Sequence, residues 1–225
     1  MGKRSFPLIQ TKSVPTGDAA WEAKRKAILD DFISKVPEDY YIPQEYVDNP
    51  PLDVTDIPRK CGILTPEELE ITENYDAVGL AAAIAIRKYT AIAVTTAFCK
   101  RAIIAHQVSC CLTQWFMDEA LERARSLDEH LANTGKTIGP LHGVPVSIKE
   151  HMAIAGRTSS YGYVSTIEHT LDDAHMVSIL RSLGAVFYVK TNQPQVLMHL
   201  ESDSHLGRVL NPHNIHLSAG GSTGG

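Results

Sequence analysis

The chain has 225 residues, of which 44% are hydrophobic and 21% are charged, an ordinary composition for a folded globular protein. Its 21 lysine and arginine residues stand against 26 acidic ones, for a formal net charge of −5, so the basic surface that nucleic-acid binding needs is not expected. No stretch approaches the roughly 18 apolar residues of a membrane span. No apolar run follows the charged start at Lys3 and Arg4, so we expect no secretory signal and a soluble, cytoplasmic protein.

The cysteines and histidines form no metal-binding pattern. No Cys-x-x-Cys pair occurs among Cys61, Cys99, Cys110 and Cys111, and the ten histidines include no His-Glu-x-x-His motif. We therefore expect reduced thiols, no metal and no cofactor.

The first part of the chain, residues 1–62, is expected to form one helix and a proline-rich arm. Residues 1–17 predict an irregular lead-in, after which Asp18 can cap a helix that runs to about Lys35. Repeated prolines in residues 37–58 then predict an arm that wraps the surface. We treat residues 63–225 as a separate domain.

Two helices are expected early in this second domain. The segment Thr65-Pro66-Glu67-Glu68 has a capping hydroxyl, a proline at the first helical position and a glutamate that completes a capping box. Asp76 predicts the start of an alanine-rich helix that runs to about Lys88, with Val78 and Ile86 among its inward-facing residues.

Two longer helices follow. Thr90 predicts the start of one, and residues 115–131 predict another, with acidic and basic residues outside and apolar residues inside. Trp115 and Phe116 are assigned to the core, because aromatic residues at helical spacing usually bury apolar area.

A half-buried strand is expected where Val144, Val146 and Ile148 alternate with other residues. Lys149 follows on the opposite side, at the end of the strand, where its amine can project into a cleft at the edge of the sheet. A lysine that is partly desolvated there can lose its proton near neutral pH and act as a base. The alternative is an exposed lysine that closes a strand.

A second strand is expected at residues 185–189. The preceding helix is predicted to be capped by Asp172 or Asp173 and to end at Gly184. The order strand, helix, strand predicts a parallel pair, whose carboxyl ends meet at one crevice. Thr191 and its neighbour Asn192 should therefore lie near Lys149.

The last six residues, Gly220-Gly221-Ser222-Thr223-Gly224-Gly225, place two hydroxyls among four glycines. Glycine lets the backbone adopt positive φ and approach other groups closely, while both hydroxyls remain free to bond. A flexible linker is one alternative. A phosphate-binding nest is another, although no Gly-x4-Gly-Lys-Ser/Thr pattern is present and no helix follows.

Taken together, these two segments resemble the amidase signature family, hydrolases with a Ser-Ser-Lys triad. In that family the catalytic lysine ends a strand of this pattern, and the middle serine lies in a Gly-Gly-Ser-Ser-Gly-Gly loop; Lys149 and Ser222 match them. The resemblance runs from about residue 63 to the end and is similar to the fungal acetamidase-like branch. It is carried further by Ile63–Thr72, Ala97–Ala102, Ala120–Ala124, Leu197–Glu201 and Asn211–Asn214.

The resemblance implies an α/β amidase-signature fold, with a mixed sheet covered by helices on both faces. It also implies hydrolysis of small, acetamide-like carboxamides, with Lys149 and Ser222 as catalytic residues and with Met198 and Ser222 lining the substrate. Ser222 is expected to follow a cis peptide bond. The expected partners are the small-molecule amide substrate and, since dimers occur among relatives of this kind, a second copy in a possible homodimer.

The chain departs from the family pattern in two minor ways and one major way. Glu150 replaces the usual Asp after the lysine, and Thr223 replaces a serine; both keep the functional group. In the family the nucleophilic serine lies in a second glycine-rich loop downstream, so the chain is expected to be an amino-terminal part, truncated before that loop. The alternative function is therefore a catalytically inactive amidase-like protein or interaction partner.

Overall fold

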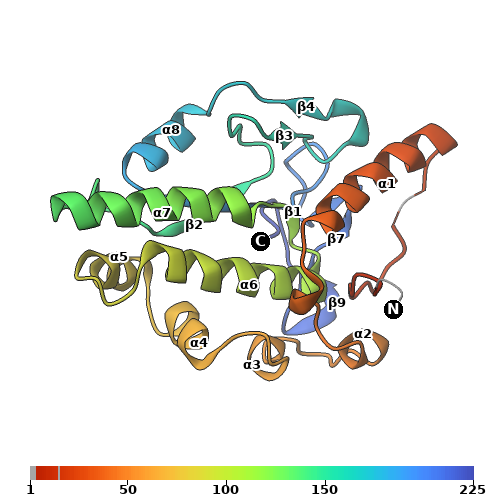
Figure 1. Ribbon diagram of the computed structural model, residues 1–225. Helices are drawn as coiled ribbons and strands as arrows, with labels where there is room; N and C mark the ends of the chain where they lie inside the picture. The colour runs from red at the N-terminus through yellow and green to blue at the C-terminus, as the bar shows by residue number, and fades with distance from the viewer. Residues whose placement is uncertain (1–3, 15) are drawn as a thin grey trace.

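The protein is described by a computed structural model covering residues 4–14 and 16–225 (Figure 1). Residues 1–3 and Pro15, which belong to the predicted lead-in, lie outside the described residues. The helices of the described chain are α1 (Ala19–Ser34), α2 (Glu45–Asp48), α3 (Ile57–Lys60), α4 (Pro66–Glu73), α5 (Ala77–Ala85), α6 (Ala91–Ser109), α7 (Met117–Thr134) and α8 (His175–Ser182), with 3-10 turns η1 (Glu38–Tyr40) and η2 (Val164–Thr166).

The central sheet is mixed, as predicted. Its strands are β1 (Leu112–Trp115), β5 (Val186–Thr191) and β2 (Pro145–Lys149), in that spatial order. β2 runs parallel to β5, and β1 runs antiparallel to it. The other strands form three separate antiparallel pairs: β3 (Thr158–Ser159) with β4 (Glu168–His169), β6 (Asp203–Ser204) with β7 (Gly207–Arg208), and β8 (Leu210–Asn211) with β9 (Asn214–Ser218), in the described part of the chain.

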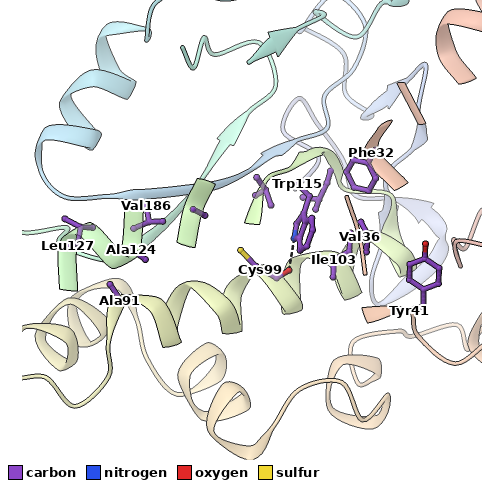
Figure 2. Packing of buried hydrophobic residues seen from close by; sticks show 13 residues of the cluster. Phe32, Val36, Tyr41, Ala91, Cys99, Ile103, Trp115, Ala124, Leu127 and Val186 are labelled. Carbon is purple, nitrogen blue, oxygen red and sulfur yellow. Dashed lines mark hydrogen bonds between the residues drawn. The ribbon is translucent and has the colours of Figure 1, made fainter. Parts of the chain in front are cut away.

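One face of the sheet is covered by the long helices α6 and α7. Their buried residues pack against β1 and β5 in a core that includes Cys99, Leu127 and Val186 (Figure 2). Trp115 joins this core, where its indole N–H donates a hydrogen bond of 2.9 Å to the carbonyl of Cys99. Both Trp115 and Phe116 are buried, as the sequence predicted.

The other face of the sheet, called here the rear face, packs against α8. Val177 of this helix is fully buried against Ile148 of β2 and Phe187 of β5. The sheet therefore has helices on both faces, in agreement with the predicted fold class. No helix in residues 4–14 and 16–225 is long and apolar enough to cross a membrane.

The amino-terminal segment takes part in the core. The predicted Asp18 cap is present: its carboxylate accepts a hydrogen bond of 2.8 Å from the backbone N–H of Trp21. In the following arm, Val54 and Ile57 are buried against α6 and the β8–β9 hairpin. The Val54 N–H also donates to the carbonyl of Pro212, at 2.8 Å. The boundary at residue 62 stays a prediction.

The expected starts of α7 and α8 were wrong in two respects. The predicted helix from Trp115 starts at Met117 instead, because Leu112–Trp115 pairs with β5 as a strand, a long-range contact that helical spacing does not reveal. The predicted cap of α8 is absent, since Asp173 accepts a hydrogen bond from Ala155 N–H and pairs with Arg181.

Candidate active site

The structure brings Lys149 and Ser222 together from positions 73 residues apart in the chain. Lys149 is the last residue of β2, and its Nζ donates a hydrogen bond of 2.6 Å to Ser222 Oγ. In the sheet, Lys149 lies beside Thr191, the last residue of β5. The two carboxyl strand ends therefore meet at one site, as the topology argument predicted.

The loop that carries Ser222 is held in place by tight packing and by main-chain bonds. A Cβ on Gly221 would lie 2.6 Å from the carbonyl oxygen of His199, so only glycine fits there. The Gly221–Ser222 peptide bond is cis. The carbonyl of Gly220 accepts from the backbone N–H of Ser202, at 3.0 Å.

The end of this loop docks onto the carboxyl end of β5. The N–H of Gly224 donates to the carbonyl of Asn192 at 2.9 Å, and the N–H of Asn192 donates to the carbonyl of Cys111 at 2.7 Å. The Asn192 side chain donates to the carbonyl of Cys110 at 3.2 Å. Asn192 thus links the Ser222 loop to the start of β1.

Burial shifts the Lys149 amine toward its neutral form. Lys149 is half-buried, and burial lowers the pKa of its amine below the usual lysine value. The adjacent carboxylate of Glu150 lies on the rear side and accepts hydrogen bonds from the backbone N–H groups of Ser160 (2.5 Å) and Tyr161 (3.1 Å). A lysine whose amine contacts a hydroxyl in this way can act as a base toward that hydroxyl.

Comparison with known proteins decides the family. A sequence model described as Amidase matches residues 93–225, more than half of the chain. The chain belongs to the amidase family. Over 169 residues it is 48% identical to an amidase of Gibberella moniliformis, and over 174 residues it is 45% identical to an acetamidase of Emericella nidulans.

These matches cover 74% and 76% of this amidase chain but only 32% of each relative, so the chain spans about a third of the length of the curated relatives it matches. Its fold is also similar to a solved fatty acid amide hydrolase, with a TM-score of 0.84 and 38% identity, over 92% of this chain and 37% of that one. The amidase-signature fold is thereby confirmed.

The remaining predicted site residue of the amidase chain, Met198, lies on an exposed turn. Its side chain is 89% exposed, and the residues before it, Val196 and Leu197, have positive φ angles of 64° and 67°. The next residue, His199, contacts Gly221, so the turn passes over the Ser222 loop. The role of Met198 in binding substrate stays a prediction.

A hollow lies beside the Ser222 loop. It has a volume of about 480 Å³, and its walls include Thr223, Gly224 and Gly225 from the loop, together with Cys111 and Arg101. Lys149 and Ser222 do not line it. Among the described residues no group of three or more His, Cys, Asp or Glu side chains is placed to hold a metal ion.

Sequence reasoning missed the polar side chains behind the site. Lys190 is fully buried, as is Gln193, although both belong to residue types that are usually exposed. The available signal was the position of Lys190, directly after an apolar strand run and before Thr191 and Asn192. Its partners, Thr158 and Ser159, lie 32 and 31 residues away in the chain, beyond the reach of a local pattern.

Proposed function

We propose that the protein carrying this chain hydrolyses the carbon–nitrogen bond of small, acetamide-like carboxamides, giving a carboxylate and ammonia. The observation that carries the proposal is the 2.6 Å hydrogen bond between Lys149 Nζ and Ser222 Oγ. Burial, which lowers the pKa of the Lys149 amine, supports its role as the base.

In the proposed mechanism, neutral Lys149 accepts the proton of Ser222. Ser222 then accepts the proton of a nucleophilic serine, whose oxygen bonds to the amide carbonyl carbon. A hydroxyl suits this relay because it both donates and accepts a hydrogen bond. The carbon–nitrogen bond breaks as the leaving nitrogen takes up a proton, and water then releases the acyl group as a carboxylate. From the resemblance, we propose that this nucleophile lies in a second glycine-rich loop downstream of the Ser222 loop, and that Lys149 and Ser222 are the other two members of the triad.

The proposed substrate class rests on the relatives. One similar protein is named an acetamidase, and a structural neighbour is named a fatty acid amide hydrolase. The two names differ in the size of the acyl group of the amide. We assign small acyl groups, with Met198 and Ser222 on the substrate side. A short and a long amide, acetamide and oleamide, compared as substrates of the same preparation, distinguish the two sizes.

We further propose a cytoplasmic location and a homodimer. Neither depends on the catalytic assignment. A fluorescent fusion checks the location, and light scattering during size-exclusion chromatography checks the mass. A mass that corresponds to one copy would contradict the homodimer.

The test of the mechanism is ammonia release from acetamide by the protein encoded by the complete gene. We expect Lys149→Ala and Ser222→Ala to lower kcat/KM by at least about 100-fold, because general acid–base catalysis typically contributes that much. Lys136→Ala is the matched control, since Lys136 is an exposed lysine that should leave the rate unchanged. Hydrolysis that survives Lys149→Ala would reject the proposed base. A wild-type protein without hydrolysis of either amide would favour the inactive amidase-like alternative.

A further inference from the structure

A polar network lies on the rear face of the sheet, directly behind Lys149. Side chains of β1 and β5 reach one segment, residues 158–161. Gln114 Nε2 and Lys190 Nζ each donate a 2.8 Å hydrogen bond to the carbonyl of Thr158. Lys190 Nζ donates another to Ser159 Oγ, also at 2.8 Å.

The same segment is held by Glu150, the residue that follows β2. Its carboxylate accepts from the backbone N–H groups of Ser160 and Tyr161, and from Gln193 Nε2 at 2.7 Å. Its main-chain carbonyl accepts from Ser159 Oγ at 3.1 Å. We call Gln114, Glu150, Ser159, Lys190 and Gln193 the rear network.

The rear network buries one charge of each sign. Lys190 is 0% exposed and Glu150 is 2% exposed. Within the described chain, neither side chain forms an ion pair within 4.0 Å. Each is instead hydrogen-bonded to neutral groups of segment 158–161. A buried charge without a compensating charge is costly, and here each is the compensating charge of the other.

This arrangement matters for Lys149 because Glu150 is its neighbour in the chain. A nearby negative charge favours the protonated form of an amine, whereas a base must be neutral. Resting on the proposed function, we infer that Lys190 is a positioning residue of the amide hydrolysis. Its buried positive charge offsets Glu150, and its hydrogen bonds fix segment 158–161 behind Lys149, so that Lys149 is neutral and directed at Ser222.

Other charged and titratable groups adjoin the rear network. Arg157 precedes the segment and pairs with Glu119 of α7, and His151 Nδ1 contacts Gln193 Oε1 at 2.9 Å. Burial lowers the pKa of Lys190 to about 8, Glu150 acts to raise it and Arg157 acts to lower it. The carboxylate of Glu150 thus favours the charged form of Lys190, which is the form that the inference needs.

The experiment measures kcat/KM for acetamide against pH, in the protein encoded by the complete gene. The wild-type rate should rise with pH as Lys149 loses its proton. In Lys190→Met the charge of Glu150 is no longer offset, so the midpoint of this rise should move to higher pH by about one unit. Lys190→Arg keeps the charge and should keep the wild-type midpoint.

A second substitution separates the electrostatic role from a merely structural one. In the double variant Lys190→Met/Glu150→Gln the negative charge is gone, so the midpoint should return toward the wild-type value. Glu150→Gln alone should move the midpoint to lower pH. Thermal unfolding checks whether Lys190→Met folds, and if it does not, Glu150→Gln alone tests the electrostatic role.

The outcomes distinguish the two proposals. Hydrolysis that requires Lys149, with an unchanged midpoint in Lys190→Met or in Glu150→Gln, would overturn the role of Lys190 only. No hydrolysis by the wild type, or full hydrolysis by Lys149→Ala, would overturn the proposed function itself.

Discussion

The two lysines at the ends of neighbouring strands show how the face of a sheet sets the role of a residue. Lys149 and Lys190 both follow apolar strand residues, and both have a pKa lowered by burial. Lys149 faces a serine hydroxyl, and Lys190 faces a carbonyl and a second hydroxyl on the rear side. The Ser159 hydroxyl donates to the main-chain carbonyl of Glu150, which does not react, so we propose only Lys149 as the base.

Another buried titratable side chain, His106, ties the stability of the fold to pH. It is 6% exposed, its Nδ1 accepts a 3.0 Å hydrogen bond from the backbone N–H of Leu112, and burial lowers its pKa to about 3. The ordinary pKa of a histidine side chain, as in an unfolded chain, is 6.5. Between these values the unfolded chain binds a proton that the folded chain does not, so stability falls as pH decreases.

We therefore expect His106→Gln, which keeps an acceptor but does not titrate, to weaken the pH dependence. From pH 6 to pH 4 the free energy of unfolding should fall more steeply in the wild type than in His106→Gln. The difference between the two slopes should be up to about 1.4 kcal/mol per pH unit. Urea unfolding at several pH values measures this slope. Parallel slopes for the two proteins would contradict the assignment, since the other histidines titrate equally in both.

At the scale of elements, α5 shows what a sequence pattern does and does not predict. Its start at Asp76 was predicted and is confirmed by the hydrogen bond of 2.7 Å from Gly79 N–H to the Asp76 carboxylate. Its buried face was predicted wrongly: Val78 and Ile86 are 78% and 77% exposed, and Leu80 and Ile84 are buried instead. A short helix rich in alanine has apolar residues on every side, so the pattern does not select a face.

The corrected face of α5 predicts opposite results for two similar truncations. Leu80 is 2% exposed and packs against the α4 and α6 side chains Ile71 and Val94, so Leu80→Ala should lower the free energy of unfolding by about 2–5 kcal/mol. Val78→Ala should change it by less than about 0.5 kcal/mol. Chemical denaturation of both variants measures these changes. A larger loss of unfolding free energy in Val78→Ala than in Leu80→Ala would show that the face with Val78 is the buried one.

The candidate site, like α5, could be predicted from the sequence only in part. Alternation along β2 and the order strand, helix, strand put Lys149 beside Thr191, and both patterns can be read from the sequence. Ser222 was identified through the resemblance of its glycine-rich loop to the amidase signature family. The burial of Lys190 depends on segment 158–161 folding back over the rear face, which no local pattern encodes. The exposure of Met198 likewise depends on a turn with two positive φ angles, which local propensity does not indicate for Val196 and Leu197.

At the scale of the whole molecule, the amino-terminal arm and the Ser222 loop share one core. Ile9 and Ile42, far from the site in sequence, are buried with Ile104 and with Ile215 of the hairpin that leads to Ser222. The hydroxyl of Thr11 also donates to the carbonyl of Ile215, at 3.0 Å. The position of the loop therefore depends on the segments that carry Ile9, Thr11 and Ile42 as well as on the sheet.

The molecule also exposes large apolar side chains on the turn over the Ser222 loop. Val196, Met198 and Leu200 are 65%, 89% and 85% exposed. Grouped apolar side chains in water favour association, because contact removes their surface from solvent. We expect the 225-residue chain alone to be poorly soluble and to associate as its concentration rises.

The double substitution Met198→Ser/Leu200→Ser should reduce this association, as measured by light scattering over a concentration series. Leu171→Ser is the matched control, since Leu171 is 88% exposed but lies outside this turn, between β4 and α8. If the double variant and the wild type associate equally, the surface through which the copies associate lies outside this turn. A clean monomer with a sharp thermal transition in the wild type would show that the exposed turn does not drive association, and the apolar side chains above Ser222 would then remain available to a substrate.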